Sequence, residues 1–465
     1  MARQTATTLA ADLAEFAVDF QAADFPADVR ADALLRVQDT VGVALAGSRM
    51  DFARPLAEVA GEQGGRPEAT AIGLGLKLPA ALAGFVNGSL SHGPDYDDTH
   101  SIAMVHIGCT AVPAALAMAE RVGATGEECL AALVLGAEVG LRIGAAAPHR
   151  FHMRHYHATS VCGPFTAATA AARLLRLDAG RTANALGLVG SQAAGLMQGL
   201  RDGSWVKRLH PGWSVQAGIT AALLAERGFT GPAEVLEGGA GLFAVLLHND
   251  EVGWRPEAVT ENLGSSWLLP GTTFKPYPNG AWNHSSMDAV AALMREAGVG
   301  HEQIERIECF VPAECIPVVC EPRETKIHPR SPYHMKFSLP YGVAMLAVLG
   351  EVRVDDFSEQ VLADSRIADL AARVECIADP EMAPERFPAR VALHTRDGRR
   401  LERFVAAQRG GPGNPMTAAE HRAKFLSNAS PALGEEAAGE LLQEVQDLWR
   451  AGGVGRLADL MGGGA

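Results

Sequence analysis

The sequence contains few cysteines and none of the paired spacings that cysteine-based sites need. Its 465 residues include seven cysteines, and no two of them form a Cys-x-x-Cys pair. Zinc-ribbon, thioredoxin-like and common iron–sulfur sites therefore have little support. Cys309, Cys315 and Cys320 come close together along the chain, but mostly apolar residues separate them. We predict that these three cysteines pack in a core or on a strand.

The sequence also lacks an excess of basic residues and any long apolar run. Its net charge of −14 at pH 7 argues against nucleic acid and anionic membranes as bulk partners, because both bind a basic face. An anionic small molecule is not excluded, since it needs only a local basic patch. No apolar run approaches the roughly 20 residues that span a bilayer. Residues 1–11 lack the basic-then-apolar pattern of a secretory signal, so we expect a cytoplasmic protein.

Several catalytic and nucleotide-binding motifs are missing as well. Gly73-Leu74-Gly75 lacks the third glycine of the dinucleotide fingerprint, and no Gly-Lys-Ser/Thr follows it. There is no Gly-x-Ser-x-Gly elbow, and no cysteine lies in an obvious activating motif. The sequence therefore argues against nucleotide binding and against a serine or cysteine nucleophile.

What the sequence does contain is the composition of a globular protein with more than one domain. Hydrophobic residues make up 48% and charged residues 20%, and the length allows two or more substantial cores. Apolar residues at helical spacing fill the first ~260 residues, and the pattern changes near Leu269-Pro270-Gly271. Helices return after the Gly/Pro-rich loop at 410–413. We predict a mainly α fold: a large discontinuous helical domain (1–268 and 409–465) with a smaller inserted α+β lid domain (269–408).

The expected elements follow from apolar spacing and from the residues that begin and end helices and strands. Predicted helices of the first domain cover 9–20, 26–47, 110–121, 127–143, 163–176, 183–198 and 215–227. In the α+β part we expect helices at 340–350 and 361–374 and strands at 306–311, 316–320, 390–395 and 400–405, the last two flanking Asp397-Gly398. Thr417 and Glu420 form a capping box, and a further helix covers 435–451.

An acidic and histidine-rich loop is the most informative local feature. Asp95, Asp97 and Asp98 lie between His92 and Thr99, and His100 and His106 follow. Carboxylates this close repel one another, so at least one needs a raised pKa or a cationic partner. The alternatives to a catalytic role for this loop are a solvated acidic loop and a site for a hard cation. A helix–loop–helix calcium site does not fit, because the alternating acidic ligands, central glycine and terminal glutamate are missing.

Two further stretches carry groups that can move protons or bind anions. Residues 149–157 contain four histidines, for which a metal site is the rival reading, although no His-Glu-x-x-His spacing is present. Lys207-Arg208-Leu209-His210 lies near a helix start, where backbone N–H groups also attract anions. The stretch 274–280 with His284 falls at the domain junction. Together these groups fit proton abstraction next to a carboxylate, followed by loss of water, loss of CO2 or return of the proton.

These motifs, in their order and spacing, resemble the MmgE/PrpD family over nearly the whole chain. The family includes 2-methylcitrate dehydratases, cis-aconitate decarboxylases and iminodisuccinate epimerases. The matching motifs are Asn87-Gly88 with His92-x-x-Asp95-Tyr-Asp97-Asp98-Thr99, His157-x-Thr159-Ser160-x-x-Gly163, Lys207-x-x-His210-x-Gly212, Gly228-Phe229-Thr230-Gly231-Pro232, Lys275-Pro276-Tyr277-Pro278 with His284 and Asp288-Ala289, and Phe337-Ser338-Leu339-Pro340-Tyr341.

The resemblance implies a homodimer that uses no metal and no cofactor, with a site between the helical domain and the lid. The resemblance and the chemistry of the side chains together indicate five catalytic residues: Asp95, His106, His157, Lys207 and Tyr341. The substrate-binding residues are Thr99, Arg208, Lys275 and His284.

The substrate stays open at this point, because the chain departs from the family pattern. His106-Ile107-Gly108 stands where decarboxylases carry His-Pro-Ser, and Asn279-Gly280-Ala281 stands where the dehydratases have an acidic-aromatic-His sequence. We expect a hydro-lyase acting on a citrate-like di- or tricarboxylic acid. The alternatives are an epimerase or decarboxylase of a related acid, and a catalytically inactive relative that binds a carboxylate.

Overall fold

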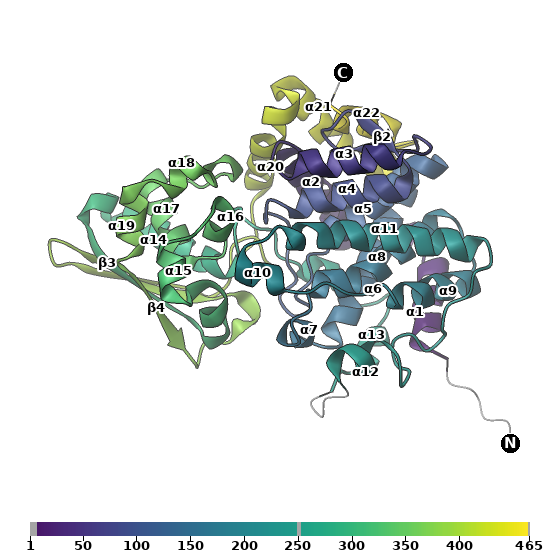
Figure 1. Ribbon diagram of the computed structural model, residues 1–465, viewed down its shortest axis with the longest axis horizontal. Helices are drawn as coiled ribbons and strands as arrows, with labels where there is room; N and C mark the ends of the chain where they lie inside the picture. Colours follow the sequence, from purple (N-terminus) through teal and green to yellow (C-terminus); the bar gives the residue numbers. More distant parts are fainter. Residues whose placement is uncertain (1–6, 249–252, 464–465) are drawn as a thin grey trace. The chain divides into compact units, whose positions relative to one another are not determined.

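The computed structural model describes residues 7–248 and 253–463, which fold into two compact units (Figure 1). Unit 1 combines the chain up to Gly93 with Ile102–Thr272 and everything from Ala419 onward. Unit 2 combines Pro94–Ser101 with Thr273–Ala418. Each unit buries its own hydrophobic core, the first among helices and the second between helices and a sheet. The predicted mainly α fold with a smaller α+β part is therefore confirmed.

The units divide the chain differently from the sequence-based boundaries at three places. The acidic segment 94–101 belongs to unit 2, the main part of unit 2 begins at Thr273 instead of 269, and it continues beyond 408 to Ala418. The segment joins unit 2 through backbone pairing, since the N–H groups of Thr99 and Thr273 each donate to the other residue's carbonyl at 2.9 Å. Such pairing between distant residues leaves no mark on the local sequence pattern.

Unit 1 is built almost entirely from helices. They are α1 (Leu9–Asp19), α2 (Ala27–Ser48), α3 (Ala53–Gln63), α4 (Ala80–His92), α5 (Gly108–Val122), α6 (Gly126–Ala145), α7 (Arg150–Met153), α8 (Ala158–Leu174), α9 (Ala179–Gly190), α10 (Gln198–Asp202), α11 (Val206–Glu226), α12 (Leu242–Leu247), α13 (Glu257–Thr260), α20 (Ala418–Leu433), α21 (Glu435–Gln446) and α22 (Gly455–Met461). A short antiparallel pair, β1 (Ala69–Ala71) and β2 (Leu76–Leu78), completes the unit.

Small residues let the central helices of unit 1 pack backbone against backbone. Helix α11 packs against both α4 and α8, and α8 also packs against α6 (Figure 1). At the crossing of α4 and α11, a Cβ added to Gly88 would lie 3.0 Å from the backbone nitrogen of Gly212. The alanine- and glycine-rich helices of the sequence thus achieve the close approach that their composition predicts.

Two helices that carry predicted site residues begin earlier than the sequence indicated. Helix α8 begins at Ala158 instead of 163, and α11 begins at Val206 instead of 215. Pro164 and Pro211 lie inside these helices, in the second turn. A proline there removes one backbone hydrogen bond but leaves the first turn intact, so the helix passes through it. As a result, Lys207 and His210 are helical residues.

Unit 2 contains a four-stranded sheet with helices packed on it. The strands are β3 (Ile304–Pro312), β4 (Val374–Asp379), β5 (Ala389–Thr395) and β6 (Arg400–Val405), in the order β4-β3-β5-β6. β3 and β4 run parallel, and the other neighbours are antiparallel. The helices are α14 (His284–Ala297), α15 (Arg323–Ile327), α16 (Pro332–Met335), α17 (Leu339–Leu349), α18 (Glu359–Leu362) and α19 (Ser365–Ala371).

Most of the predicted elements of unit 2 are present, including the hairpin β5–β6 and helix α17. The prediction of a strand at 316–320 was wrong, because Ile316–Cys320 forms a π-helical turn. A short apolar run does not distinguish strand from helix, and Pro317 has no N–H to donate to a sheet. The predicted helix at 361–374 divides into α18 and α19, and its last residue already belongs to β4. Cys309, Cys315 and Cys320 are buried, as predicted.

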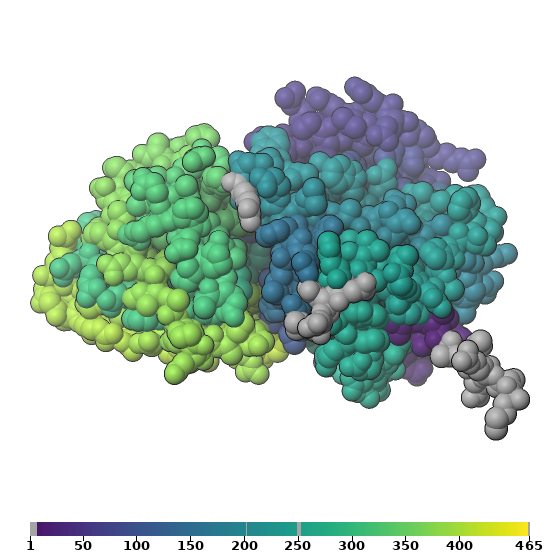
Figure 2. Space-filling view, turned by 60° about the horizontal axis from the view of Figure 1, so that its bottom comes forward, coloured from purple at the N-terminus to yellow at the C-terminus, as the bar shows by residue number. Residues whose placement is uncertain are grey.

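Segments far apart in the sequence lie side by side in unit 1. In Figure 2 the purple atoms of the N-terminal helix α1 lie beside teal atoms that follow α11. The contact includes the backbone N–H of Leu9, which donates to the carboxylate of Glu237 at 3.0 Å. Among the described helices of both units, none combines the length and the apolar character needed to cross a bilayer.

Candidate functional site

Four histidines of unit 1 surround a fifth, His157. We call the five residues the imidazole cluster: His92, His106, His152, His157 and His210. The ring centroids of the other four lie 5.2 to 6.0 Å from that of His157. These residues span more than a hundred positions of the sequence, so only the tertiary fold brings them together.

Helix ends position most of the cluster. His92 is the last residue of α4, and His106 lies just before α5. His157 is the N-cap of α8, and its backbone N–H donates to the carbonyl of Gly195 at 2.8 Å. The loop of His106 is tied to the first turn of α8, because the hydroxyl of Thr159 accepts the backbone N–H of His106 at 3.0 Å. His106, His157 and His210 therefore lie at or near the N-terminal ends of α5, α8 and α11.

Three imidazoles of the cluster, those of His152, His157 and His210, are electrically neutral at neutral pH. Burial lowers the pKa of His157 well below its ordinary value, and Lys207 and the neighbouring histidines lower it further. Burial, with His92 and Lys207, lowers the pKa of His210 to about 4. Removal from water, with Lys207 and His149, lowers the pKa of His152 to about 3. Each of these three rings thus carries one proton and one lone pair, which suits it to proton transfer.

His157 uses one ring nitrogen for a partner and leaves the other available. Its Nδ1 lies 3.1 Å from Nδ1 of His210. Its Nε2 is buried and has no hydrogen-bond partner within the described part of the chain. A buried polar atom without a partner is destabilising unless a ligand or water satisfies it. Nε2 of His157 is therefore the atom of the cluster best placed to meet a substrate.

The two cations of the α11 start have different surroundings. Lys207 is buried and close enough to lower the pKa values of His152, His157 and His210. The guanidinium of Arg208 lies 3.7 Å from the carboxylate of Asp51 and stacks on Phe52 and Trp205. Lys207 thus belongs to the imidazole cluster, and Arg208 is engaged by its own neighbours.

Three of the imidazoles also resemble a metal-binding set. One ring nitrogen from each of His92, His106 and His157 lies within 4.8 Å of the others. Two nitrogens on one zinc ion, each about 2.1 Å from it, are only about 3.4 Å apart in a tetrahedral site. The bound of 4.8 Å is wider than this separation, so it does not establish tetrahedral geometry. We assign no metal to them.

Unit 2 holds another group of predicted site residues, centred on a buried ion pair. Nζ of Lys275 donates to the backbone carbonyl of Asp95 at 3.0 Å and lies 3.4 Å from its carboxylate. Asp95 has a φ of 55°, a left-handed conformation that non-glycine residues seldom adopt. The backbone pairing of Thr99 with Thr273 holds the same segment. The cationic partner that the acidic loop needs is therefore Lys275.

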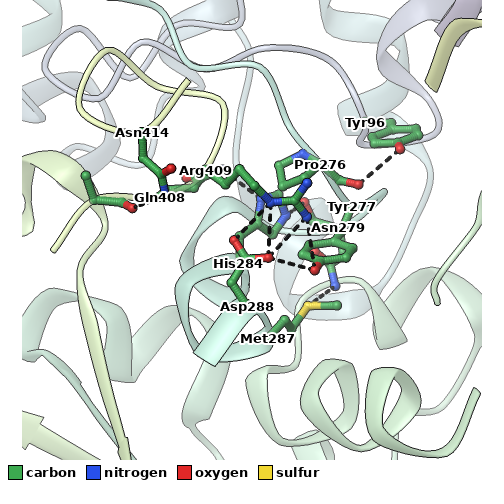
Figure 3. Close-up of polar contacts among 11 residues, drawn as sticks. Tyr96, Pro276, Tyr277, Asn279, His284, Met287, Asp288, Gln408, Arg409 and Asn414 are labelled. Atoms are coloured by element: carbon green, nitrogen blue, oxygen red, sulfur yellow. Dashed lines mark hydrogen bonds and ion pairs between the residues drawn. The ribbon is translucent and has the colours of Figure 1, made fainter. Parts of the chain in front are cut away.

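His284 is held at both ring nitrogens, as Figure 3 shows. The side-chain amide of Gln408 lies 2.7 Å from Nδ1, and the carbonyl of Asn279 lies 3.2 Å from Nε2. A neutral ring with its proton on Nε2 satisfies both contacts, since Nδ1 then accepts from Gln408. Burial and Lys275 lower the pKa of His284 well below its ordinary value. His284 is a fixed, neutral residue whose nitrogens are both in use.

A second network in Figure 3 surrounds Asp288 on α14. Its carboxylate accepts the hydroxyl proton of Tyr277 at 2.7 Å and two guanidinium protons of Arg409, at 3.1 and 3.2 Å. Sequence reasoning missed the roles of Gln408 and Arg409, because they lie on either side of the predicted end of the lid, next to a loop. The only signal was Asp288, which forms part of one of the quoted motifs.

Tyr341, expected to be catalytic, lies in the core of unit 2. It belongs to α17, and its hydroxyl donates to the backbone carbonyls of Val361 and Leu362 at 3.2 and 3.3 Å. Burial raises the pKa of this hydroxyl to about 12. The hydroxyl thus ties α17 to α18, and we leave Tyr341 out of the proposed chemistry.

The predicted site residues therefore fall into two sets. In unit 1, the structure brings His106, His157 and Lys207 together. In unit 2, it brings Asp95 and Lys275 together and holds Thr99 in the same segment. That the two sets act on one substrate stays a prediction.

Comparison with known sequences identifies the family. The MmgE/PrpD N-terminal domain matches residues 11–255, and the MmgE/PrpD C-terminal domain matches residues 277–449. The chain belongs to the MmgE/PrpD family. Among curated MmgE/PrpD relatives, a cis-aconitate decarboxylase-like protein, oryM, of Aspergillus oryzae is 27% identical over 97% of both chains. Human cis-aconitate decarboxylase is 27% identical over 80% of this chain and 77% of its own. The cis-aconitate decarboxylase of Aspergillus terreus is 28% identical over 61% of this chain and 60% of its own.

Proposed function

We propose that this MmgE/PrpD protein is a lyase that acts on a di- or tricarboxylic acid by moving a proton at the carbon next to a carboxylate. The observation that carries the proposal is Nε2 of His157, a buried and unpartnered ring nitrogen. It belongs to a neutral imidazole that lies beside the buried ammonium group of Lys207. A neutral imidazole can take or give a proton, and the ammonium group neutralises a carboxylate.

The surroundings of the imidazole cluster favour an anionic substrate. The N-terminal ends of α8 and α11 carry partial positive charge, and Lys207 adds a full one. In the proposed reaction Lys207 binds a substrate carboxylate, His157 transfers the proton, and His106 serves the departing or entering group. We assign Thr99 and Lys275 of unit 2 to substrate binding and Asp95 to the orientation of Lys275.

Decarboxylation is the first reaction to test. The relatives named above are cis-aconitate decarboxylases or resemble one, which supports loss of CO2 over the loss of water expected from the sequence. When CO2 leaves, its bonding electron pair stays on carbon and must take up a proton, for which His157 Nε2–H is the donor. In dehydration the same nitrogen would act as the base and water would leave. Both reactions need the same carbanion-like intermediate.

The experiment compares candidate acids in D2O. Purified protein is incubated with cis-aconitate, 2-methylcitrate, citrate and iminodisuccinate, and CO2 release and deuterium incorporation are followed by NMR. We expect CO2 release with one deuterium incorporated from cis-aconitate or a close analogue. Deuterium uptake with loss of water would show the hydro-lyase instead. No product and no exchange with any di- or tricarboxylate would contradict the proposal and favour a binding protein.

Replacing His157 tests the assignment of the proton-transfer residue. His157→Ala should lower kcat about a hundredfold or more, because a positioned acid or base contributes on the order of 10²–10⁴-fold. His155→Ala is the matched control, since His155 is exposed and lies in the same segment. Near-normal turnover of the His157 variant, with a normal circular dichroism spectrum, would remove His157 from the mechanism.

A further inference from the structure

The contact between His157 and His210 has a chemical consequence, because it joins two nitrogens of the same kind. The two Nδ1 atoms are 3.1 Å apart, and both residues are buried, with 1% and 2% of their surface exposed. Two neutral imidazoles form this hydrogen bond only if one ring carries its proton on Nδ1 and the other does not. Whether His210 carries its proton on Nδ1 therefore determines whether Nε2 of His157 is protonated.

The choice between the two forms separates an acid from a base. If His210 donates from Nδ1, then His157 holds its proton on Nε2 and can protonate a substrate. If His157 donates, its Nε2 carries a lone pair and can remove a proton. The hydrogen bond made by one ring nitrogen of a catalytic histidine selects its tautomer, and therefore whether the other nitrogen carries a proton.

His210 also connects the pair to solvent. It lines a surface cavity of about 790 Å³ in unit 1, together with Ser160, Gly195 and Trp213. Trp213 is 47% exposed, so this cavity is open to water. Gly195 packs closely beside His157 and Ser160: its carbonyl accepts the N–H of His157, and a Cβ added to it would lie only 2.5 Å from Cβ of Ser160. His210 thus stands between His157 and the cavity.

We propose that His210 is a positioning residue that selects the protonation form of His157 and exchanges protons between it and the water of this cavity. The proposal rests on the proposed function of His157. When a substrate proton binds to Nε2 of His157, the proton on its Nδ1 passes to Nδ1 of His210, and His210 releases its own Nε2 proton to cavity water. Donation to a substrate follows the same steps in reverse. Each bond formed to a proton is matched by one broken, and neither ring retains a charge.

This exchange explains how a buried histidine with a low pKa can act in both directions. Within the described ranges, the groups recorded against the His157 ring are His92, His106, His152, His210 and Lys207, which are histidines and a lysine. They oppose an imidazolium at His157. A ring that passes each proton onward does not need to hold that charge.

Two substitutions of His210 test the proposal. His210→Leu removes the hydrogen bond, whereas His210→Asn keeps a polar group at the position of Nδ1 but cannot pass a proton onward. His155→Asn is the matched control. The measurements are kcat and KM, the fraction of substrate-derived deuterium lost to solvent, and the ¹⁵N resonances of His157, which distinguish a proton on Nδ1 from one on Nε2.

We expect the leucine variant to lower kcat about a hundredfold with little change in KM, and to leave His157 as a mixture of both forms. The asparagine variant should restore a single form and part of the turnover, while more substrate deuterium returns to substrate or product. A leucine variant with wild-type kcat and an unchanged ¹⁵N pattern would overturn the positioning role. Equal loss of deuterium to solvent in the asparagine variant and the wild type would overturn the proton exchange.

The ¹⁵N measurement needs no substrate, so it separates this inference from the proposed function. If the wild type is inactive with all acids but His210→Leu mixes the two forms of His157, only the proposed function fails. If the wild type is active and the leucine variant is too, only the role of His210 fails.

Discussion

Burial keeps His152, His157 and His210 neutral, and the same burial ties the stability of unit 1 to pH. The pKa of His210 is lowered to about 4 and that of His152 to about 3, whereas an unfolded histidine has a pKa of about 6.5. Between these values the unfolded chain binds protons that the folded chain does not. Stability is therefore complete above about pH 6.5 and falls as the pH drops toward 4.

We predict a loss of stability below pH 6 that depends on His210. Each such histidine contributes a slope of up to about 1.4 kcal/mol per pH unit within its window. Urea unfolding of unit 1, followed at pH 7.5, 6.0 and 5.0, should show a smaller loss in His210→Asn than in the wild type. His155→Asn, at an exposed position, should follow the wild type. Equal losses in all three proteins would contradict the low pKa of His210.

A single residue, Asp288, also contributes to the stability of unit 2. Asp288 accepts protons from both Tyr277 and Arg409. Asp288→Ala removes an acceptor shared by two groups and should destabilise unit 2 by about 2–3 kcal/mol, whereas Tyr277→Phe removes one hydroxyl and should cost about 1 kcal/mol. Denaturant unfolding of both variants measures the difference. A larger effect of Tyr277→Phe would show that the ring, and not the carboxylate, organises this network.

A site residue could be predicted from the sequence only where it belongs to a recognisable motif. The sequence indicated His106, His157 and Lys207, which the structure brings together. It gave no sign that His210 would be the partner of His157 or that Gln408 would hold His284, because these contacts join positions 53 and 124 residues apart. Tyr341 shows the opposite case, a motif residue whose hydroxyl bonds to the backbone of its own unit.

At the scale of elements, apolar spacing predicted where helices exist better than where they begin. Helices were predicted to begin at 163 and 215, but α8 and α11 begin at Ala158 and Val206 and continue through Pro164 and Pro211. Each of these helices loses one backbone hydrogen bond and gains packing along its remaining turns, as the burial of their residues shows. At 316–320 the local pattern was ambiguous, and tertiary packing selected a helical turn.

The crossing of α4 and α11 should tolerate no added side chain. Gly212 packs against the backbone of Phe85, so Gly212→Ala would force the two helices apart and should destabilise unit 1 by about 1–3 kcal/mol. Gly439 of α21 is the matched control, because a Cβ there meets nothing within 4 Å. Gly439→Ala should stabilise the protein by about 0.5–1 kcal/mol through helix propensity. Thermal unfolding of the two variants should therefore shift in opposite directions.

At the scale of the whole molecule, the two hydrophobic cores share no residue. We predict two calorimetric transitions in the intact protein. Gly212→Ala should lower the transition of unit 1 and leave the other in place, and Asp288→Ala should do the reverse. A single transition that both variants shift equally would show that the units unfold together.

The sequence by itself determined the fold class, the family and the kind of chemistry, because composition, apolar period and ordered motifs are local properties that survive without coordinates. Only the tertiary structure decided that segment 94–101 joins unit 2, that four imidazoles surround His157, and which nitrogen of His157 is left without a partner. Those outcomes depend on backbone pairing and side-chain burial between residues distant in the chain. Burial, moreover, sets the protonation on which the proposed reaction depends.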